Sequence, residues 1–298
     1  MSASSWLAPT DATRGQRWLN RWWPSRRLRW DPLHGLRVDD RYAPVSIANW
    51  KLIPAVARGL LARRVTRPLS FNDDRRLTVI IPYRDRAEHL GILLPELSAR
   101  LKEQDISHRI LVVEQEVGAL FNRGRLLNAG MRYAAEFSDY YCFHDVDAVP
   151  IVANYACPSQ PLRLVKTVLN TAGERKHTAH YFSGAITIRK EQAFAVHGFS
   201  NEYWGWGKED DDFYFRLLLS GYLCYFDLKG AFRDLPNPPH QCVRRGPVLP
   251  THVKLNRRRR SLLLRGLTVP SDDGVHTLKF RVIERLVDAD YEHITVRW

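Results

Sequence analysis

The chain has 298 residues, 45% of them hydrophobic, and a formal net charge of +13. This length permits one large domain or two small ones with a sizeable core. No stretch approaches the roughly 20 apolar residues of a membrane-spanning helix, and the four cysteines lack the C-x-x-C spacing of a metal site. A basic chain favours phosphate-bearing partners: nucleic acid, anionic lipid or a sugar nucleotide.

The first 70 residues differ in composition from the rest. They hold thirteen Lys or Arg against four Asp, and six of the nine tryptophans stand among these arginines. Tryptophan interleaved with arginine is typical of a segment at a membrane surface. An extension whose tryptophans pack onto the main domain and a nucleic-acid-binding arm are the alternatives. We therefore divide the chain into an N-terminal extension, residues 1–70, and a globular domain, residues 71–298.

The globular domain begins with alternating strands and helices. Short apolar, β-branched runs predict buried strands, and apolar residues at helical spacing predict helices between them. This order predicts an α/β fold with a mostly parallel sheet and helices on both faces, in which ligands bind at the carboxyl ends of the strands. The predicted strands are 77–82, 109–113 and 140–143, and the predicted helices are 89–101 and 122–137.

The second half of the domain has fewer clear elements. A strand is predicted at 181–188 and a short helix at 191–196, and an acidic segment opens a further helix that runs to residue 219. Residues 227–256 are rich in proline and charge, which predicts a loop. The segments 277–284 and 293–298 are predicted to be closing strands.

The most unusual stretch is 204–212, where Trp-Gly-Trp-Gly-Lys precedes four consecutive carboxylates. Like charges placed side by side disfavour each other's ionisation. Acidic residues suit the N-terminus of a helix, where they complement the free N–H groups and the macrodipole. Aromatic rings beside carboxylates commonly form a sugar site, and glycines let the backbone approach a ligand. We expect both a helix start and the wall of a binding site.

A second acidic motif stands at the end of the third strand. Alternation along an extended segment turns Asp145 and Asp147 to the same side, and two carboxylates facing one point suit Mg²⁺ or Mn²⁺ on a diphosphate. Arg84, Arg86 and Arg123 follow other strand ends, and guanidinium groups suit phosphate oxygens. With Glu209 or Asp210 as a general base, these parts describe glycosyl transfer from a nucleotide sugar.

These motifs resemble those of the β-1,4-galactosyltransferase family, glycosyltransferase family seven. The resemblance implies the GT-A fold, a Rossmann-like nucleotide-sugar-binding α/β/α sandwich. It implies an inverting, Mn²⁺- or Mg²⁺-dependent transfer of galactose from UDP-galactose to a sugar hydroxyl of a glycan or lipid-linked acceptor. The matching segments are 80–86, 113–115, 121–128, 143–147, 181–184, 198–201 and 204–212, with 271–274 and 293–296 at the C-terminal end.

The resemblance also implies residue roles. Asp210 corresponds to the catalytic base, with Glu209 beside it, and Tyr181 to the position that favours galactose over N-acetylgalactosamine. Trp206, on a loop that closes over the donor, contacts donor and acceptor. The donor-binding positions are Pro82, Arg84, Arg86, Phe121, Arg123, Asp145, Val146, Asp147, Tyr181, Gly184 and Trp206. The acceptor-binding positions are Trp206, Asp211, Arg259 and Leu263.

The metal site is where the resemblance is least complete. Asp147 corresponds to the family's metal-binding aspartate. Relatives complete the site with a Met and a His, or with two His, from a downstream loop. The matching stretch here, 232–240, offers Asp234 and His240. A carboxylate with an imidazole suits Mn²⁺, so we predict Asp147, Asp234 and His240 as ligands, with His252 as the next candidate. The alternative is that Asp234 only caps a turn and that His240 is solvated.

Some features depart from the family. Lys208 stands where many members have glycine. No N-terminal anchor is visible in the sequence, and residues 1–20 lack the apolar core of a signal peptide. We therefore predict a bacterial-type, cytoplasmic enzyme, peripheral on the inner face of the plasma membrane. The alternative functions are a UDP-N-acetylgalactosamine-dependent transferase, a catalytically inactive lectin-like relative, and a basic nucleic-acid-binding protein, which the acidic cluster disfavours.

Overall fold

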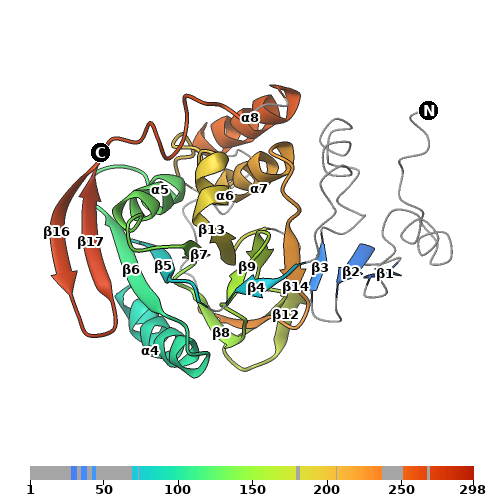
Figure 1. The fold of residues 1–298 in the computed structure, drawn as a ribbon. Helices are drawn as coiled ribbons and strands as arrows, with labels where there is room; N and C mark the ends of the chain where they lie inside the picture. Colours follow the sequence, from blue (N-terminus) through green and yellow to red (C-terminus); the bar gives the residue numbers. More distant parts are fainter. Residues whose placement is uncertain are drawn as a thin grey trace, which may run out of the picture.

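The computed structural model describes residues 28–31, 35–38, 42–44, 69–72, 74–178, 182–205, 207–236, 251–266 and 269–298. At the described positions within 28–44, 175–178 and 262–266 the structure describes the backbone alone. Figure 1 shows a central sheet with helices on both of its faces.

Four parallel strands form the centre of the main sheet. They are β7 (Tyr140–His144), β5 (Leu77–Tyr83), β6 (His108–Gln115) and β17 (Glu292–Arg297), in that spatial order. All residues of β5 and β7 are buried, because a strand covered on both faces needs a continuous apolar run. The carboxyl ends of β5, β6 and β7 therefore meet at one edge of the sheet, as the sequence predicts.

Antiparallel pairing extends the sheet on both sides. On one side β16 (Arg281–Val287) pairs with β17. On the other, β13 (Ala185–Arg189) pairs with β7, and β10 (Leu162–Arg163) then joins β13 antiparallel and β14 (Tyr225–Asp227) parallel. The closing strand predicted at 277–284 corresponds to β16 and begins four residues later than expected. Residues 274–278 instead form a turn, in which the N–H groups of Thr277 and Leu278 donate to the carbonyl of Gly274.

The helices position the site residues. α4 (Ala87–Glu103) covers one face of the sheet, and α5 (Arg123–Tyr133), α6 (Lys190–Ala195) and α7 (Glu209–Leu219) lie on the other (Figure 1). α5 begins at a capped end, where the Asn122 side chain accepts a hydrogen bond from the N–H of Arg125 at 2.9 Å. Consequently Arg123 stands on the first turn of α5, beside the ends of the parallel strands.

The predicted loop at 227–256 is wrong in part. Residues 231–234 form β15 (Ala231–Asp234), which pairs with β8 (Ala148–Val152) in a four-stranded sheet that also contains β11 (Thr167–Leu169) and β12 (Arg175–Thr178). β4 (Phe71–Asn72) and β9 (Cys157–Pro158) form a small ribbon. α8 (Thr251–Gly266) occupies the end of the predicted loop and packs against α7. The sequence did not predict this helix because a run of four arginines interrupts the helical spacing of its apolar residues.

Part of the N-terminal extension joins the main sheet. β1 (Leu28–Asp31), β2 (Gly35–Val38) and β3 (Tyr42–Pro44) form an antiparallel meander, and β3 pairs with β14. The backbone of these eleven residues is thus attached to the main sheet through β3, and the alternative in which the extension packs its tryptophans onto the main domain stays a prediction. The remaining residues of the extension lie outside the described ranges, so the boundary at residue 70 stays a prediction.

Candidate active site

The loop after β5 and the loop before α5 come together at the edge of the sheet. The Arg84 guanidinium carbon lies 5.2 Å from the centroid of the Phe121 ring, and Nη1 of Arg84 donates to the carbonyl of Ala119 at 2.8 Å. The N–H of Gly205 donates to the carbonyl of Phe121 at 2.7 Å. Two predicted donor-binding residues therefore stand side by side, and the tryptophan loop begins directly beside them.

Arg123 links the two acidic motifs. Its Nε donates to Oδ1 of Asp145 at 2.8 Å, and its Nη1 lies 3.9 Å from Oε1 of Glu209. The Arg123 side chain is only 12% exposed. Burial disfavours its charge, but the attraction of Asp145, Glu209 and Asp210 outweighs burial and raises the pKa of Arg123. The structure thus brings together the motif at the end of β7 and the acidic start of α7, which lie 64 residues apart.

The four consecutive carboxylates have different partners. Glu209 faces Arg123, and the Asp210 carboxylate accepts a hydrogen bond from the N–H of Asp211 at 2.8 Å. Asp211 pairs with Lys208 at 2.8 Å and with Arg260 of α8 at 3.2 Å. Asp212 points into the core, where it is 3% exposed. One acidic run therefore contacts the arginine at the strand ends, the helix α8 and the core.

Burial sets the protonation of the first two carboxylates. It raises the pKa of Glu209 to about 7, with repulsion from Asp210 adding to the effect and Arg123 opposing it. The pKa of Asp210 is raised in the same way, by burial first and then by Asp211. A carboxylate whose pKa lies nearer neutrality is a stronger base than an ordinary one and is suited to accept a proton from a hydroxyl.

Lys208 has a backbone φ of +85° at the N-cap of α7. This left-handed conformation favours glycine, because a side chain there is strained. The sequence departure at Lys208 therefore carries a conformational cost, which the ion pair with Asp211 at 2.8 Å partly offsets.

The backbones of Asp147 and Asp234 are adjacent. Asp234 lies opposite Ala148 in the pairing of β15 with β8, and the N–H of Leu235 donates to the carbonyl of Asp147 at 2.9 Å. Asp145 is engaged by Arg123. Mn²⁺ and Mg²⁺ prefer oxygen ligands, so two carboxylates on adjacent backbones are compatible with such a metal; the role of Asp147 and Asp234 as its ligands stays a prediction.

The structure gives no support for a metal-binding role of the two predicted histidines, His240 and His252. Within the described ranges no three His, Cys, Asp or Glu side chains gather closely enough to hold a metal ion. His240 lies outside those ranges, so its role stays a prediction. The ring of His252 lies against Gly205, where a Cβ atom would approach the ring Cδ2 to 2.7 Å. This contact places His252 beside the tryptophan loop.

α8 borders the site and carries two of the predicted acceptor-binding residues, Arg259 and Leu263. Nη1 of Arg259 donates to the carbonyl of Glu202 at 2.6 Å, and its Nη2 lies 3.5 Å from the Glu202 carboxylate. The residue that contacts Asp211 is Arg260, which the sequence did not single out. The side chain of Leu263 is not described, and its role stays a prediction.

Asn256 of α8 holds the tryptophan loop at both ends. Its amide nitrogen donates to the carbonyls of Trp204 and Gly207, at 3.0 and 3.1 Å, and the residue is 1% exposed. Trp206 itself, between these anchors, lies outside the described residues, as does Tyr181. The predicted roles of both stay predictions. A single Asn in a basic helix gives no sequence signal for this contact.

Asn256→Ala is expected to loosen the loop, because it removes two hydrogen bonds that together contribute about 1–3 kcal/mol. The expected result is faster amide hydrogen exchange at residues 204–207 and a higher KM for the donor. Lys254→Ala, an exposed change on the same helix, serves as the control. Unchanged exchange at 204–207 in Asn256→Ala would show that the loop is held elsewhere.

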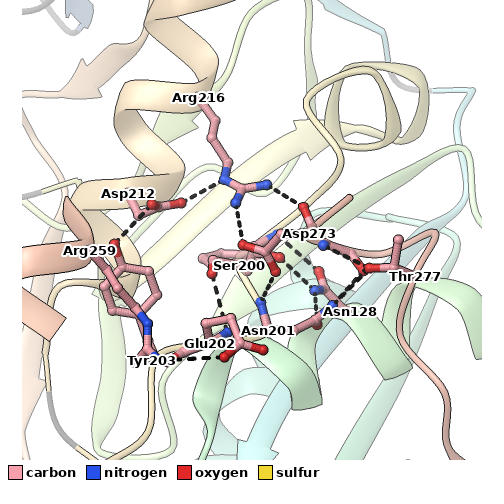
Figure 2. Close-up of polar contacts among 12 residues, drawn as sticks. Asn128, Ser200, Asn201, Glu202, Tyr203, Asp212, Arg216, Arg259, Asp273 and Thr277 are labelled. Carbon is pink, nitrogen blue, oxygen red and sulfur yellow. Dashed lines mark hydrogen bonds and ion pairs between the residues drawn. The ribbon is translucent and has the colours of Figure 1, made fainter. Parts of the chain in front are cut away.

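A buried ionic network fixes the other side of α7. Figure 2 shows Arg216 between Asp212 and the C-terminal Asp273. Its Nε donates to Asp212 at 2.6 Å and its Nη2 to Asp273 at 2.9 Å. Asp212 also accepts a hydrogen bond from the Tyr203 hydroxyl at 2.9 Å, and Asp273 from the N–H of Asn201 at 2.7 Å. The closing segment 271–274 therefore positions both α7 and the segment that leads into the tryptophan loop.

Two family models match the chain. One, described as the N-terminal region of glycosyl transferase group 7, covers residues 51–158. The other, described as the N-terminal domain of galactosyltransferase, covers residues 163–230. Together they include both acidic motifs and the arginines of the strand-end loops.

Curated relatives match over a longer stretch. Rat β-1,4-galactosyltransferase 4 is 34% identical over 250 residues, which is 82% of this chain and 68% of the relative. The human enzyme of the same name is 39% identical over 170 residues, 56% of this chain and 48% of the relative. The matched part of this chain thus spans about half the length of the human relative.

Two solved structures of a Drosophila relative share the fold. The catalytic domain of β1,4-galactosyltransferase 7 in complex with xylobiose is 25% identical, with a TM-score of 0.59, and the match covers 74% of this chain and 93% of that one. A mutant of the same enzyme in complex with manganese, UDP-Gal and xylobiose is 26% identical, with a TM-score of 0.61 and the same coverage.

The fold is that of a GT-A glycosyltransferase, which confirms the predicted fold class. Within that class, the chain belongs to the β-1,4-galactosyltransferase family. The predicted cytoplasmic location, on the inner face of the plasma membrane, is wrong, because the relatives are galactosyltransferases of the Golgi type. Every helix among the described residues is too short or too polar to span a bilayer.

Proposed function

We propose that this protein transfers galactose from UDP-galactose to a hydroxyl of a sugar acceptor, with inversion at the anomeric carbon. The observation that carries the proposal is the buried pairing of Arg123 with Asp145 and Glu209. Oε2 of Glu209 and Nη1 of Arg123 are buried there and have no hydrogen-bond partner among the described residues. Unpartnered polar atoms that converge in one place indicate a bound polar molecule.

The residues divide the chemistry among themselves. Arg84 and Arg123 are placed to bind the diphosphate and to stabilise its charge as it leaves. Asp210 takes the proton of the attacking hydroxyl, and Asp211 and Arg259 orient the acceptor. Asp147 and Asp234 would hold the metal, which when bound supplies positive charge to the diphosphate.

The relatives support this choice of donor. The Drosophila structure contains manganese, UDP-Gal and xylobiose, so a related fold accommodates a UDP-sugar beside a disaccharide. The acceptor of this chain is accordingly proposed to be a glycan or a lipid-linked sugar. UDP-N-acetylgalactosamine is the alternative donor. We propose that the bulk of Tyr181 disfavours it, and Tyr181 lies outside the described ranges.

A donor screen tests the function. UDP release is measured with UDP-galactose, UDP-N-acetylgalactosamine and UDP-glucose, each with Mn²⁺ or Mg²⁺ and a panel of monosaccharide and disaccharide acceptors. Acceptor-dependent UDP release that is highest with UDP-galactose supports the proposal. Preference for another donor would replace galactose, and absence of turnover with every donor would point to the lectin-like alternative.

The metal ligands are tested by titrating Mn²⁺. We expect Asp147→Ala to abolish activity and Asp234→Ala to raise the Mn²⁺ concentration for half-maximal activity by about 10-fold or more, the scale of a weakened metal site. His240→Ala and His252→Ala are measured in parallel, and only a true ligand should shift the titration. If Asp234→Ala titrates like the wild type, Asp234 caps a turn and does not bind metal.

Membrane attachment through residues 1–70 is a further part of the proposal. It rests on the interleaved tryptophans and arginines of that segment. Flotation with anionic liposomes should show binding that weakens as salt rises. Because β3 pairs with β14, the comparison variant replaces Arg21, Arg26 and Arg27 with Gln and keeps the strand. Equal flotation of the two proteins would remove the segment from this role.

A further inference from the structure

Arg163 is a buried arginine in the middle of the sheet. It lies on β10, opposite Ile186 of β13 and Phe226 of β14, and is 2% exposed. Its Nε donates to the carbonyl of Ser183 at 2.9 Å, so the side chain runs along β13 toward the edge where the site lies. The sequence shows it only as a lone charge in an apolar run, 162–165.

The guanidinium group of Arg163 is incompletely satisfied. Among the described residues no ion pair joins Arg163 to a carboxylate, and its buried Nη1 has no hydrogen-bond partner. Burial lowers the pKa of Arg163 to about 9, and the carboxylates that oppose this effect are Asp210 and Asp145. A cation buried in this way is costly unless a partner arrives.

The backbone places Arg163 beside the donor site. The N–H of Asp145 donates to the carbonyl of Gly184 at 2.8 Å, next to the Ser183 carbonyl that Arg163 binds. Gly184 has a φ of +88°, and a Cβ atom there would approach Val165 to 2.9 Å, so the turn is tight and close to β10. Arg123 contacts Asp145 from α5, and Arg163 reaches the same turn from the sheet.

We propose that Arg163 contacts the donor, its free Nη1–H group donating a hydrogen bond to a hydroxyl of the sugar that is transferred. This inference rests on the proposed function, in which Arg123, the partner of Asp145, binds the diphosphate and Asp210 takes the proton of the acceptor, so that the transferred sugar lies between these two groups. The diphosphate has Arg84, Arg123 and the metal as partners. Carboxylates accept the protons of sugar hydroxyls, which leaves the hydroxyl oxygens to accept from a buried N–H donor. Arg163 thereby helps to select the sugar.

The test compares Arg163→Met and Arg163→Lys with the wild type on UDP-galactose and on its 2-, 3-, 4- and 6-deoxy analogues. The matched control is Arg189→Met, which removes an arginine at the far end of β13 from the site, where it donates to the carbonyl of Pro158 at 3.0 Å and lies 3.8 Å from Glu191. We expect Arg163→Met to lower kcat/KM for UDP-galactose by about 10- to 100-fold. With one deoxy analogue, the one that lacks the contacted hydroxyl, wild type and variant should be equal.

The binding of UDP alone separates this role from a structural one. UDP has no galactose, so Arg163→Met should bind it with unchanged affinity. An equal loss of kcat/KM with all four analogues, or a matching loss of UDP affinity, would overturn the proposal. If Arg163→Met does not fold, the same comparison is made with Arg163→Lys. Failure of the wild type to use UDP-galactose would instead refute the proposed function, and the analogue series is then built on the donor that the screen identifies.

Discussion

Asp210→Asn is expected to lower turnover by about 10²-fold or more while UDP-galactose still binds, because the amide cannot accept the proton of the attacking hydroxyl. The substitution keeps the size of the side chain and its acceptor for the N–H of Asp211. The measurements are kcat with a saturating acceptor and the affinity for the donor by calorimetry. Near-normal turnover would remove Asp210 from the role of base.

Two matched variants and a pH profile sharpen this test. Asp211→Asn should raise the KM of the acceptor, and Glu209→Gln should weaken the donor site that Arg123 bridges. Burial raises the pKa of Asp210 and that of Glu209, and the base acts only when deprotonated. Activity of the wild type should therefore fall as the pH is lowered through the raised pKa values of this pair, of which that of Glu209 is about 7, and the Asp210→Asn variant should lose the part of this dependence that belongs to Asp210.

The sequence predicted those parts of the fold that depend on local pattern. The apolar runs that became β5, β6 and β7 are continuous because each is covered on both faces, and the loops that follow them carry Arg84, Arg123 and Asp145. Parallel pairing then places these loops at one edge. The acidic run was correctly expected to begin a helix, and its role as the wall of a sugar site stays a prediction.

Other contacts depend on pairing between distant segments and leave no local signal. The sequence gives no sign of the contacts of Arg163 and Asn256. Arg163 lies beside Gly184 because of the position of β10, and Asn256 contacts the tryptophan loop because of the position of α8. α8 was missed because four consecutive arginines mask its apolar face. The approach of Asp234 to Asp147 was anticipated only through the family resemblance, and it arises from the pairing of β15 with β8.

The ionic network around Arg216 explains how one acidic run remains compatible with a stable core. Arg216 is 1% exposed and has two carboxylate partners from different parts of the chain. Burial raises the pKa of Asp212, while Arg216 and the Tyr203 hydroxyl oppose the shift. Removing Arg216 would leave the Asp212 carboxylate buried without a counter-ion, which is among the most destabilising single changes in a protein.

Arg216→Met is accordingly expected to lower the free energy of unfolding by about 3–5 kcal/mol at pH 8, measured by urea denaturation. Without Arg216 the folded-state pKa of Asp212 rises further above its unfolded value. A carboxyl of this kind binds a proton on folding, so the variant gains stability relative to the wild type as the pH falls toward the unfolded pKa near 4.

Adding Asp212→Asn to Arg216→Met should recover part of the loss at pH 8. The control, Lys102→Met, breaks an exposed pair with Asp290 and should change little. A deficit in Arg216→Met that is the same at pH 8 and pH 5, and that Asp212→Asn does not reduce, would mean that Arg216 stabilises the core through packing rather than through its charge.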